Sequence, residues 1–61
     1  MTDSTQVIDS EGTKWEYEII KTNDGYTVKE YKNNSFSYKW NRETKEKALL
    51  LVEHWLYKYS D

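Results

Sequence analysis

The sequence has no Cys and no Pro, and only two of its 61 residues are Gly. Without Cys the chain can form neither a disulfide framework nor a Cys-based zinc site, and its single His leaves a conventional structural zinc site without enough ligands. The two glycines, at positions 12 and 25, are too far apart to form a Gly-rich phosphate loop. We therefore expect no cofactor and no bound metal.

Long hydrophobic runs are also missing. No stretch approaches the roughly 20 apolar residues that a membrane-spanning helix requires. The first five residues, Met1 to Thr5, are polar and acidic, unlike a secretion signal. The lack of Cys is typical of proteins in a reducing compartment. The sequence thus predicts a cytoplasmic protein with no membrane partner.

Aromatic residues are plentiful, with three Trp, six Tyr and one Phe. A chain of this size buries only about 60% of the surface that its unfolded form exposes, so a small core must be used efficiently. Each buried aromatic side chain removes roughly 150–250 Å² from water. We expect these residues to supply most of the core of a single domain at residues 13–61.

Charge divides the chain unevenly. Residues 1–12 contain three acids and no base, whereas residues 13–61 contain eight acids and nine bases. We interpret residues 1–12 as a polar acidic tail, with a short extra strand at residues 6–8, turning through residues 9–12, as the alternative. The nearly neutral remainder argues against a strongly basic nucleic-acid-binding protein.

Three segments alternate between apolar and polar residues, which predicts half-buried strands at residues 14–22, 26–32 and 35–40. Asn23-Asp24-Gly25 and Asn33-Asn34 separate these segments and are typical of tight hairpin turns. The alternation places one set of side chains inward: Trp15, Tyr17, Ile19, Tyr26, Val28, Phe36, Tyr38 and Trp40. The outward set is Glu16, Glu18, Ile20, Thr27, Lys29, Tyr31, Ser35, Ser37 and Lys39.

The remaining segment, from about Glu43 to Tyr57, has the periodicity of an amphipathic helix, with Asn41 or Thr44 as its N-cap. Laying this helix across the sheet would bury both apolar faces at once. The sequence therefore predicts an α+β fold in which a three-stranded antiparallel β-meander is packed on one face by a C-terminal α-helix, in the order β-β-β-α. The helix residues expected to face the core are Ala48, Leu51, Val52, Trp55, Leu56 and Tyr59.

The junction Thr44-Lys45-Glu46-Lys47-Ala48 opens this helix directly after an aromatic-rich strand. In this junction and in the preceding meander, the chain resembles AP2-type domains and the arm-binding N-terminal domains of tyrosine integrases. The resemblance covers most of residues 13–59 in topology and implies that the outer sheet face would lie in the major groove of DNA. Those families present several strand Arg or Lys, whereas the only Arg here is expected in a loop. The nucleic-acid-binding candidates are Lys29, Tyr31, Lys39 and Arg42.

Leu50 and Tyr57 stand seven residues apart on the helix stripe that is nearly opposite the expected core face. With Glu53 and His54 beside them, they could form the apolar centre and polar rim of a small interface. His54 has no Cys nucleophile and no evident Ser partner, so we expect no catalysis.

Three hypotheses follow from these patterns. The leading one is a small non-enzymatic protein-interaction module that binds a partner protein through the outer helix face or a strand edge. The alternatives are a nucleic-acid-binding domain that uses the outer sheet face and a homodimeric structural unit. A composition rich in Lys, Asn and Tyr suits an AT-rich phage or bacterial genome, where small regulators and inhibitors are common.

Overall fold

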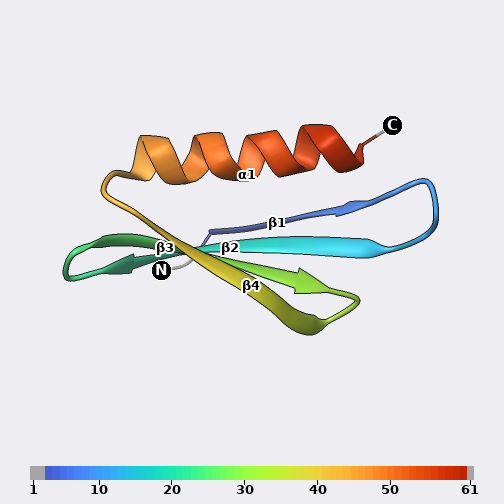
Figure 1. Cartoon of the computed structure of the whole chain (residues 1–61), viewed down its shortest axis with the longest axis horizontal. Coiled ribbons are helices and arrows are strands. Elements are labelled where there is room, and N and C mark those ends of the chain that lie inside the picture. Colours follow the sequence, from blue (N-terminus) through green and yellow to red (C-terminus); the bar gives the residue numbers. More distant parts are fainter. Residues whose placement is uncertain (1–2, 61) are drawn as a thin grey trace.

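The computed structural model describes residues 3–60. Four strands are followed by one helix: β1 (Asp3–Ile8), β2 (Lys14–Thr22), β3 (Gly25–Lys32), β4 (Ser35–Arg42) and α1 (Lys45–Tyr59). The strands form one antiparallel sheet in the order β1-β2-β3-β4, and α1 lies across one face of it (Figure 1). The α+β class and the C-terminal helix are confirmed. The predicted count of three strands is wrong, because the sheet has four.

The additional strand is β1, which falls within the segment interpreted as a tail. It pairs antiparallel with β2, from Asp3 opposite Ile19 to Ile8 opposite Lys14. Most of its side chains are exposed, and only Val7 is half-buried among residues 4–8. The polar sequence indicated at most the short alternative strand at residues 6–8, because backbone pairing, rather than side-chain burial, joins β1 to the sheet.

Asp9 stabilises the connection between β1 and β2. Its carboxylate accepts hydrogen bonds from the backbone N–H groups of Glu11 and Thr13 at 3.0 and 2.9 Å, and from the indole N–H of Trp15 at 3.0 Å. The Trp15 bond first, and then the backbone bonds, hold the pKa of Asp9 below its usual range. The loop is closed further by Gly12, whose N–H donates to the Asp9 carbonyl at 3.0 Å.

The two remaining turns lie where the sequence predicts them. Asn33 and Asn34 have φ angles of 50° and 71°, the backbone of the tight turn that best matches the twist of a hairpin. In the other turn the positive φ, 147°, belongs to Gly25, the first residue of β3. Strand β4 extends as far as Arg42, so the expectation that Arg42 lies in a loop is wrong.

The core forms between the two central strands and α1. Tyr17, Ile19 and Val28 from the sheet and Ala48 and Val52 from the helix are buried. Partly buried side chains pack around them: Trp15, Tyr26, Trp40, Leu51, Trp55 and Leu56. The predicted inward face of the helix is therefore confirmed.

Helix α1 begins and ends about two residues later than predicted. Thr44, one of the two predicted caps, accepts a hydrogen bond from the N–H of Lys47 at 3.2 Å. At the other end, the N–H of Ser60 donates to the carbonyl of Leu56 at 2.9 Å. These caps satisfy backbone groups that a helix leaves unpaired at its ends.

A β-bulge interrupts the pairing of β3 with β4. Glu30 lies opposite Tyr38 and Tyr31 lies opposite Phe36, which leaves Ser37 as the extra residue. The extra residue turns Phe36 to the outer face, where its ring meets Tyr31 edge to face at 6.0 Å. The prediction that Phe36 faces inward is wrong for this reason, and its side chain is 57% exposed.

Glu30 is a buried carboxylate, only 7% exposed. It accepts hydrogen bonds from the hydroxyl of Tyr17 at 2.6 Å and from that of Ser37 at 2.9 Å. Ser37 was predicted to face outward, and this bond shows that its hydroxyl instead reaches the inner side. Burial first, and then the bond to Glu30 and its charge, raise the pKa of Tyr17 well above the ordinary 10.0.

The two glycines make a matched pair for testing backbone constraints. A Cβ on Gly25 would lie 2.5 Å from the carbonyl oxygen of Arg42, whereas a Cβ on Gly12 would meet nothing within 4 Å. Both residues have positive φ, so each Ala variant is strained, but only Gly25→Ala adds a clash with backbone. Urea unfolding should show a loss of about 1 kcal/mol for Gly12→Ala and more than about 2 kcal/mol for Gly25→Ala. Equal losses would contradict the close approach of β3 to the end of β4.

The bond between Tyr17 and Glu30 can be tested with a second pair of variants. Tyr17→Phe should reduce the free energy of unfolding by about 1.5–3 kcal/mol, because it removes a donor from a buried carboxylate. Tyr57→Phe, at a side chain that is 74% exposed, should cost less than about 0.5 kcal/mol.

The stabilisation from the bond between Tyr17 and Glu30 should depend on pH in the alkaline range. Because folding raises the pKa of Tyr17, its contribution is complete below pH 10.0 and is lost as the pH rises further. The Tyr17→Phe chain should therefore lose less stability above pH 10.0 than the unmodified chain does. An equal loss of unfolding free energy in the two chains above pH 10.0 would count against this bond.

Candidate interaction surfaces

The outer face of α1 carries large apolar side chains that contribute nothing to the core. Leu50 is 64% exposed and Tyr57 is 74% exposed, and neighbouring Leu49 is 40% exposed. Leu50 and Tyr57 lie on the side of the helix away from buried Ala48 and Val52, as the spacing predicts, and Leu49 lies on the flank between the two faces. We call Leu49, Leu50 and Tyr57 the outer ridge.

Acidic side chains flank the outer ridge. Glu46 stands four residues before Leu50 and Glu53 four residues before Tyr57, spacings that place neighbours on one helix surface, and both acids are exposed. His54 is exposed at the side of the ridge, and its ring meets that of Trp55 edge to face at 5.3 Å. The four partner-binding candidates named from the sequence are therefore all on the surface of α1.

A surface hollow of about 570 Å³ lies beside this face and is lined by His54, Tyr57 and Lys58. The Lys58 ammonium stands over the ring of Trp55 at 4.9 Å. A cation placed over an indole in this way is attracted by the ring electrons. The hollow therefore has a positive charge among the residues that line it.

A row of aromatic rings continues from the helix onto β4. Trp55 stacks against Trp40 with centroids 6.0 Å apart, and Trp40 meets Tyr38 at 4.9 Å. Tyr38 is 56% exposed, and both tryptophans are half-buried. We call Tyr38, Trp40 and Trp55 the aromatic ledge. In the opposite direction, Trp55 is followed by more rings, since Tyr59 stacks between it and Trp15.

The outer sheet face holds three of the four nucleic-acid-binding candidates. Lys29 lies opposite Lys39 on one side and opposite Glu18 on the other. The hydroxyl of Tyr31 donates to Glu18 at 3.4 Å, and burial first, then the charge of Glu18, raise the pKa of Tyr31. Acids and bases are thus interspersed on this face, which weakens its attraction for a phosphate backbone.

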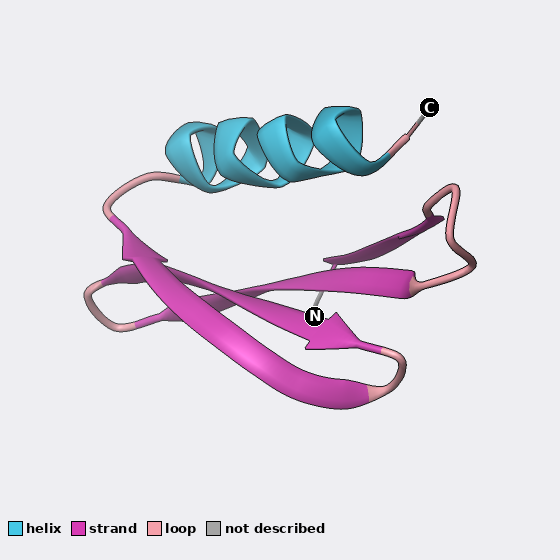
Figure 2. Cartoon of the chain, turned by 45° about the vertical axis from the view of Figure 1, so that its right-hand side comes forward, coloured by secondary structure: helices cyan, strands magenta, loops and turns pink. Residues whose placement is uncertain are grey.

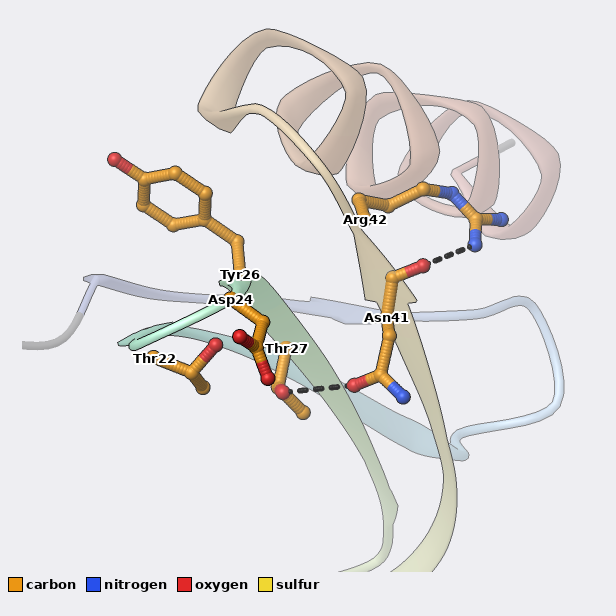
Figure 3. A pocket seen from close by; sticks show the side chains of 6 residues that line it. All are labelled: Thr22, Asp24, Tyr26, Thr27, Asn41 and Arg42. Atoms are coloured by element: carbon orange, nitrogen blue, oxygen red, sulfur yellow. Dashed lines mark hydrogen bonds between the residues drawn. The ribbon is translucent and has the colours of Figure 1, made fainter.

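Arg42, the fourth candidate, does not join that group. It lies opposite Tyr26, two residues along from the Val28–Trp40 pair that faces the helix. Its guanidinium donates to the carbonyl of Asn41 at 2.8 Å and points away from Asp24 (Figure 3). These residues line a pocket of about 330 Å³, formed by Thr22, Asp24, Tyr26, Thr27, Asn41 and Arg42.

Some of the polar groups that line this pocket bond to one another. The hydroxyl of Thr27 donates to the side-chain oxygen of Asn41 at 2.9 Å, across the strands (Figure 3). A binding pocket usually directs a few polar groups at one point inside it. Here the side-chain oxygen of Asn41 and the hydroxyl of Thr27 are already paired with each other, and we assign the pocket no ligand.

Sequence reasoning missed the exposed aromatics of β4. Simple alternation places Phe36 and Tyr38 in the core, yet both are more than half exposed. One signal of an irregularity in β4 was available in the sequence. Glu30 is a carboxylate at an inward position of β3, and a buried carboxylate requires polar partners from the neighbouring strands. No local sequence motif marks the bulge at Ser37.

Residues 3–60 contain no helix long and apolar enough to cross a membrane. The same residues contain no cluster of three or more His, Cys, Asp or Glu side chains placed to hold a metal ion. Comparisons with protein families, with curated proteins and with solved structures find no match for this chain. The topological resemblance to AP2-type and integrase arm-binding domains is accordingly without support from solved structures.

Two tryptophans provide a test of the aromatic packing, since each has a Lys ammonium over its ring. Trp15 donates its N–H to Asp9, whereas the N–H of Trp55 is buried without a partner within residues 3–60. Trp15→Phe should therefore reduce the free energy of unfolding by more than Trp55→Phe does in urea unfolding, because only the first breaks a charged hydrogen bond.

Acid should reduce that difference. Since the pKa of Asp9 is lowered by folding, its contribution is present above the ordinary 3.8 and is lost as the pH falls. A Trp55→Phe loss as large as that of Trp15→Phe at neutral pH would mean that Trp55 has a partner.

Proposed function

We propose that this chain is a small non-enzymatic protein-interaction module that binds a partner protein through the outer ridge of α1. The observation that carries the proposal is the 64% and 74% exposure of Leu50 and Tyr57 on a helix whose opposite face already forms the core. A surface helix usually presents polar residues on its outer face. Large apolar side chains aligned on that face and rimmed by polar ones are typical of an interface.

The charges beside the ridge indicate what kind of surface it binds. Glu46 and Glu53 are exposed next to Leu50 and Tyr57. A partner with an apolar groove rimmed by Lys or Arg would complement them, in the manner of a helix docked in a groove.

We further propose that the module is a regulator or inhibitor of phage or bacterial origin that acts in the cytoplasm. The composition, rich in Lys, Asn and Tyr, and the absence of Cys support this assignment. A chain of 61 residues with one small core is suited to occupying a surface of another protein.

Affinity capture followed by titration tests the ridge. Leu50→Glu and Tyr57→Ala should fold normally, because both side chains are largely exposed. A protein captured by the unmodified chain, once purified, should bind both variants at least about tenfold more weakly in calorimetric titration. Lys21→Glu, at an exposed position on β2, is the matched control and should bind that protein as the unmodified chain does.

Three results would overturn this assignment. Equal affinity of both ridge variants and the unmodified chain would place the contact elsewhere. Sedimentation showing a dimer that Leu50→Glu dissociates would identify a second copy as the occupant. Unfolding of either variant, seen by circular dichroism, would mean that the ridge contributes to the core.

A further inference from the structure

Strand β4 forms an open edge of the sheet. It pairs with β3 on one side, and no strand within residues 3–60 pairs with it on the other. Figure 2 shows β4 at the front, with its first half turned away from α1. Residues 35–39 are all exposed. An edge of this kind presents unpaired backbone N–H and C=O groups to any extended chain that lies beside it.

The charge of this edge has one sign. Residues 35–42 include Lys39 and Arg42 and no acid. Lys58 adds a further positive charge next to the aromatic ledge, where it stands over Trp55. The opposite edge strand, β1, has no base. The two edges of the sheet therefore differ in the partner that they attract.

A charged residue and a bulge on an edge strand commonly prevent strands from pairing with copies of themselves. Both devices occur in β4, at Lys39 and Ser37. Two copies joined antiparallel through β4 would gather two Lys39 and two Arg42 side chains along one seam. The same charges attract an acidic strand, so they exclude self-pairing while they leave the edge usable by another chain.

Apolar contacts are available on both sides of the edge. On the helix side, Tyr38 is 56% exposed and continues into the aromatic ledge through Trp40. On the outer side, Phe36 is 57% exposed. Because side chains of an added strand alternate between the two faces of the sheet, each face would meet an aromatic ring.

We propose that β4 binds an acidic, extended segment of a partner protein, which adds to the sheet as a further strand beyond β4. Its backbone pairs with the free groups of β4, its carboxylates lie on the outer face near Lys39, and its apolar side chains lie on the helix side and contact the aromatic ledge. This is the mode of binding known as β-augmentation. It uses a different surface from the outer ridge of α1 and does not depend on the function proposed for that ridge.

Two synthetic heptapeptides test this site on the full chain, one of alternating Glu and Val and one of alternating Lys and Val. The Glu-Val peptide should change the Trp fluorescence and should bind about tenfold more tightly when salt is lowered from 0.5 M to 0.05 M. In NMR titrations the amide signals of residues 35–42 should shift, and those of the outer ridge should not. The Lys-Val peptide should not bind.

A modified peptide and variants of the chain separate the contribution of backbone pairing from that of charge. A Glu-Val peptide that is N-methylated at every residue has no backbone donors, and its affinity should fall at least about tenfold. The Lys39→Glu variant should bind the peptide without N-methyl groups more weakly by a similar factor. Lys21→Glu makes the same charge change at an exposed position of β2 and should have little effect. Leu50→Glu on the outer ridge should have none.

Several outcomes would overturn the proposal. If the Glu-Val peptide does not bind at a concentration of about 1 mM, its Kd is too weak for a specific site, and the edge is not a docking surface. Equal binding of the N-methylated peptide would show that the backbone of β4 is not used. Tighter binding of a single-stranded oligothymidylate to the same residues would assign the aromatic ledge and its lysines to nucleic acid. Self-association that low salt strengthens would point to β1 of a second copy as the acidic strand.

Discussion

The carboxylate of Glu30, buried beneath the helix, is the group on which the arrangement of β4 depends. A charge removed from water must be hydrogen-bonded, and the available donors are the hydroxyls of Tyr17 on β2 and Ser37 on β4. The bond to Ser37 holds the bulged residue inward, and the bulge sends Phe36 to the opposite face. One polar requirement inside the domain thus decides which aromatic side chains are available at its surface.

A second constraint is that one helix must cover a sheet of four strands. Helix α1 crosses the sheet so that Trp55 meets Trp40 on β4, whereas Tyr59 at its end stacks on Trp15 of β2. This placement buries Val28 completely but leaves the first half of β4 without cover (Figure 1). The proposed ridge on α1 has Glu46 and Glu53 on one flank and Lys47 on the other, whereas the proposed edge on β4 carries bases and no acid, so the two surfaces are suited to different partners.

Much of this fold follows from alternation, turn residues and helical periodicity, which require no knowledge of long-range contacts. Val28, Ala48 and Val52 are buried as their spacing predicts, and Asn33-Asn34 turns the chain as expected. Strand β1 was foreseen only as the alternative of a short strand at residues 6–8, and the bulge at Ser37 was not predicted. The first is held by backbone pairing and by Asp9, and the second by Glu30, so neither leaves a periodic pattern of apolar residues. The exposure of Leu50 and Tyr57 was predictable because a helix phase fixes every residue on it. The exposed rings of β4 were not predictable: one inserted residue reverses the phase of Phe36, and Tyr38 keeps its inward phase but lies where the helix does not cover β4.

The strand order of the sheet, which follows the order of the chain, has a consequence for how the protein forms. Every strand pairs with its immediate neighbour in sequence, so each hairpin can close without waiting for a distant segment. Helix α1 is synthesised after all four strands, and until it docks, Tyr17 and Val28 have no cover on the inner face. During synthesis the chain therefore passes through a state in which the sheet is paired but its inner apolar face is exposed, and such a state is prone to aggregation. The rate at which Lys45–Tyr59 docks on the sheet sets how long this state lasts.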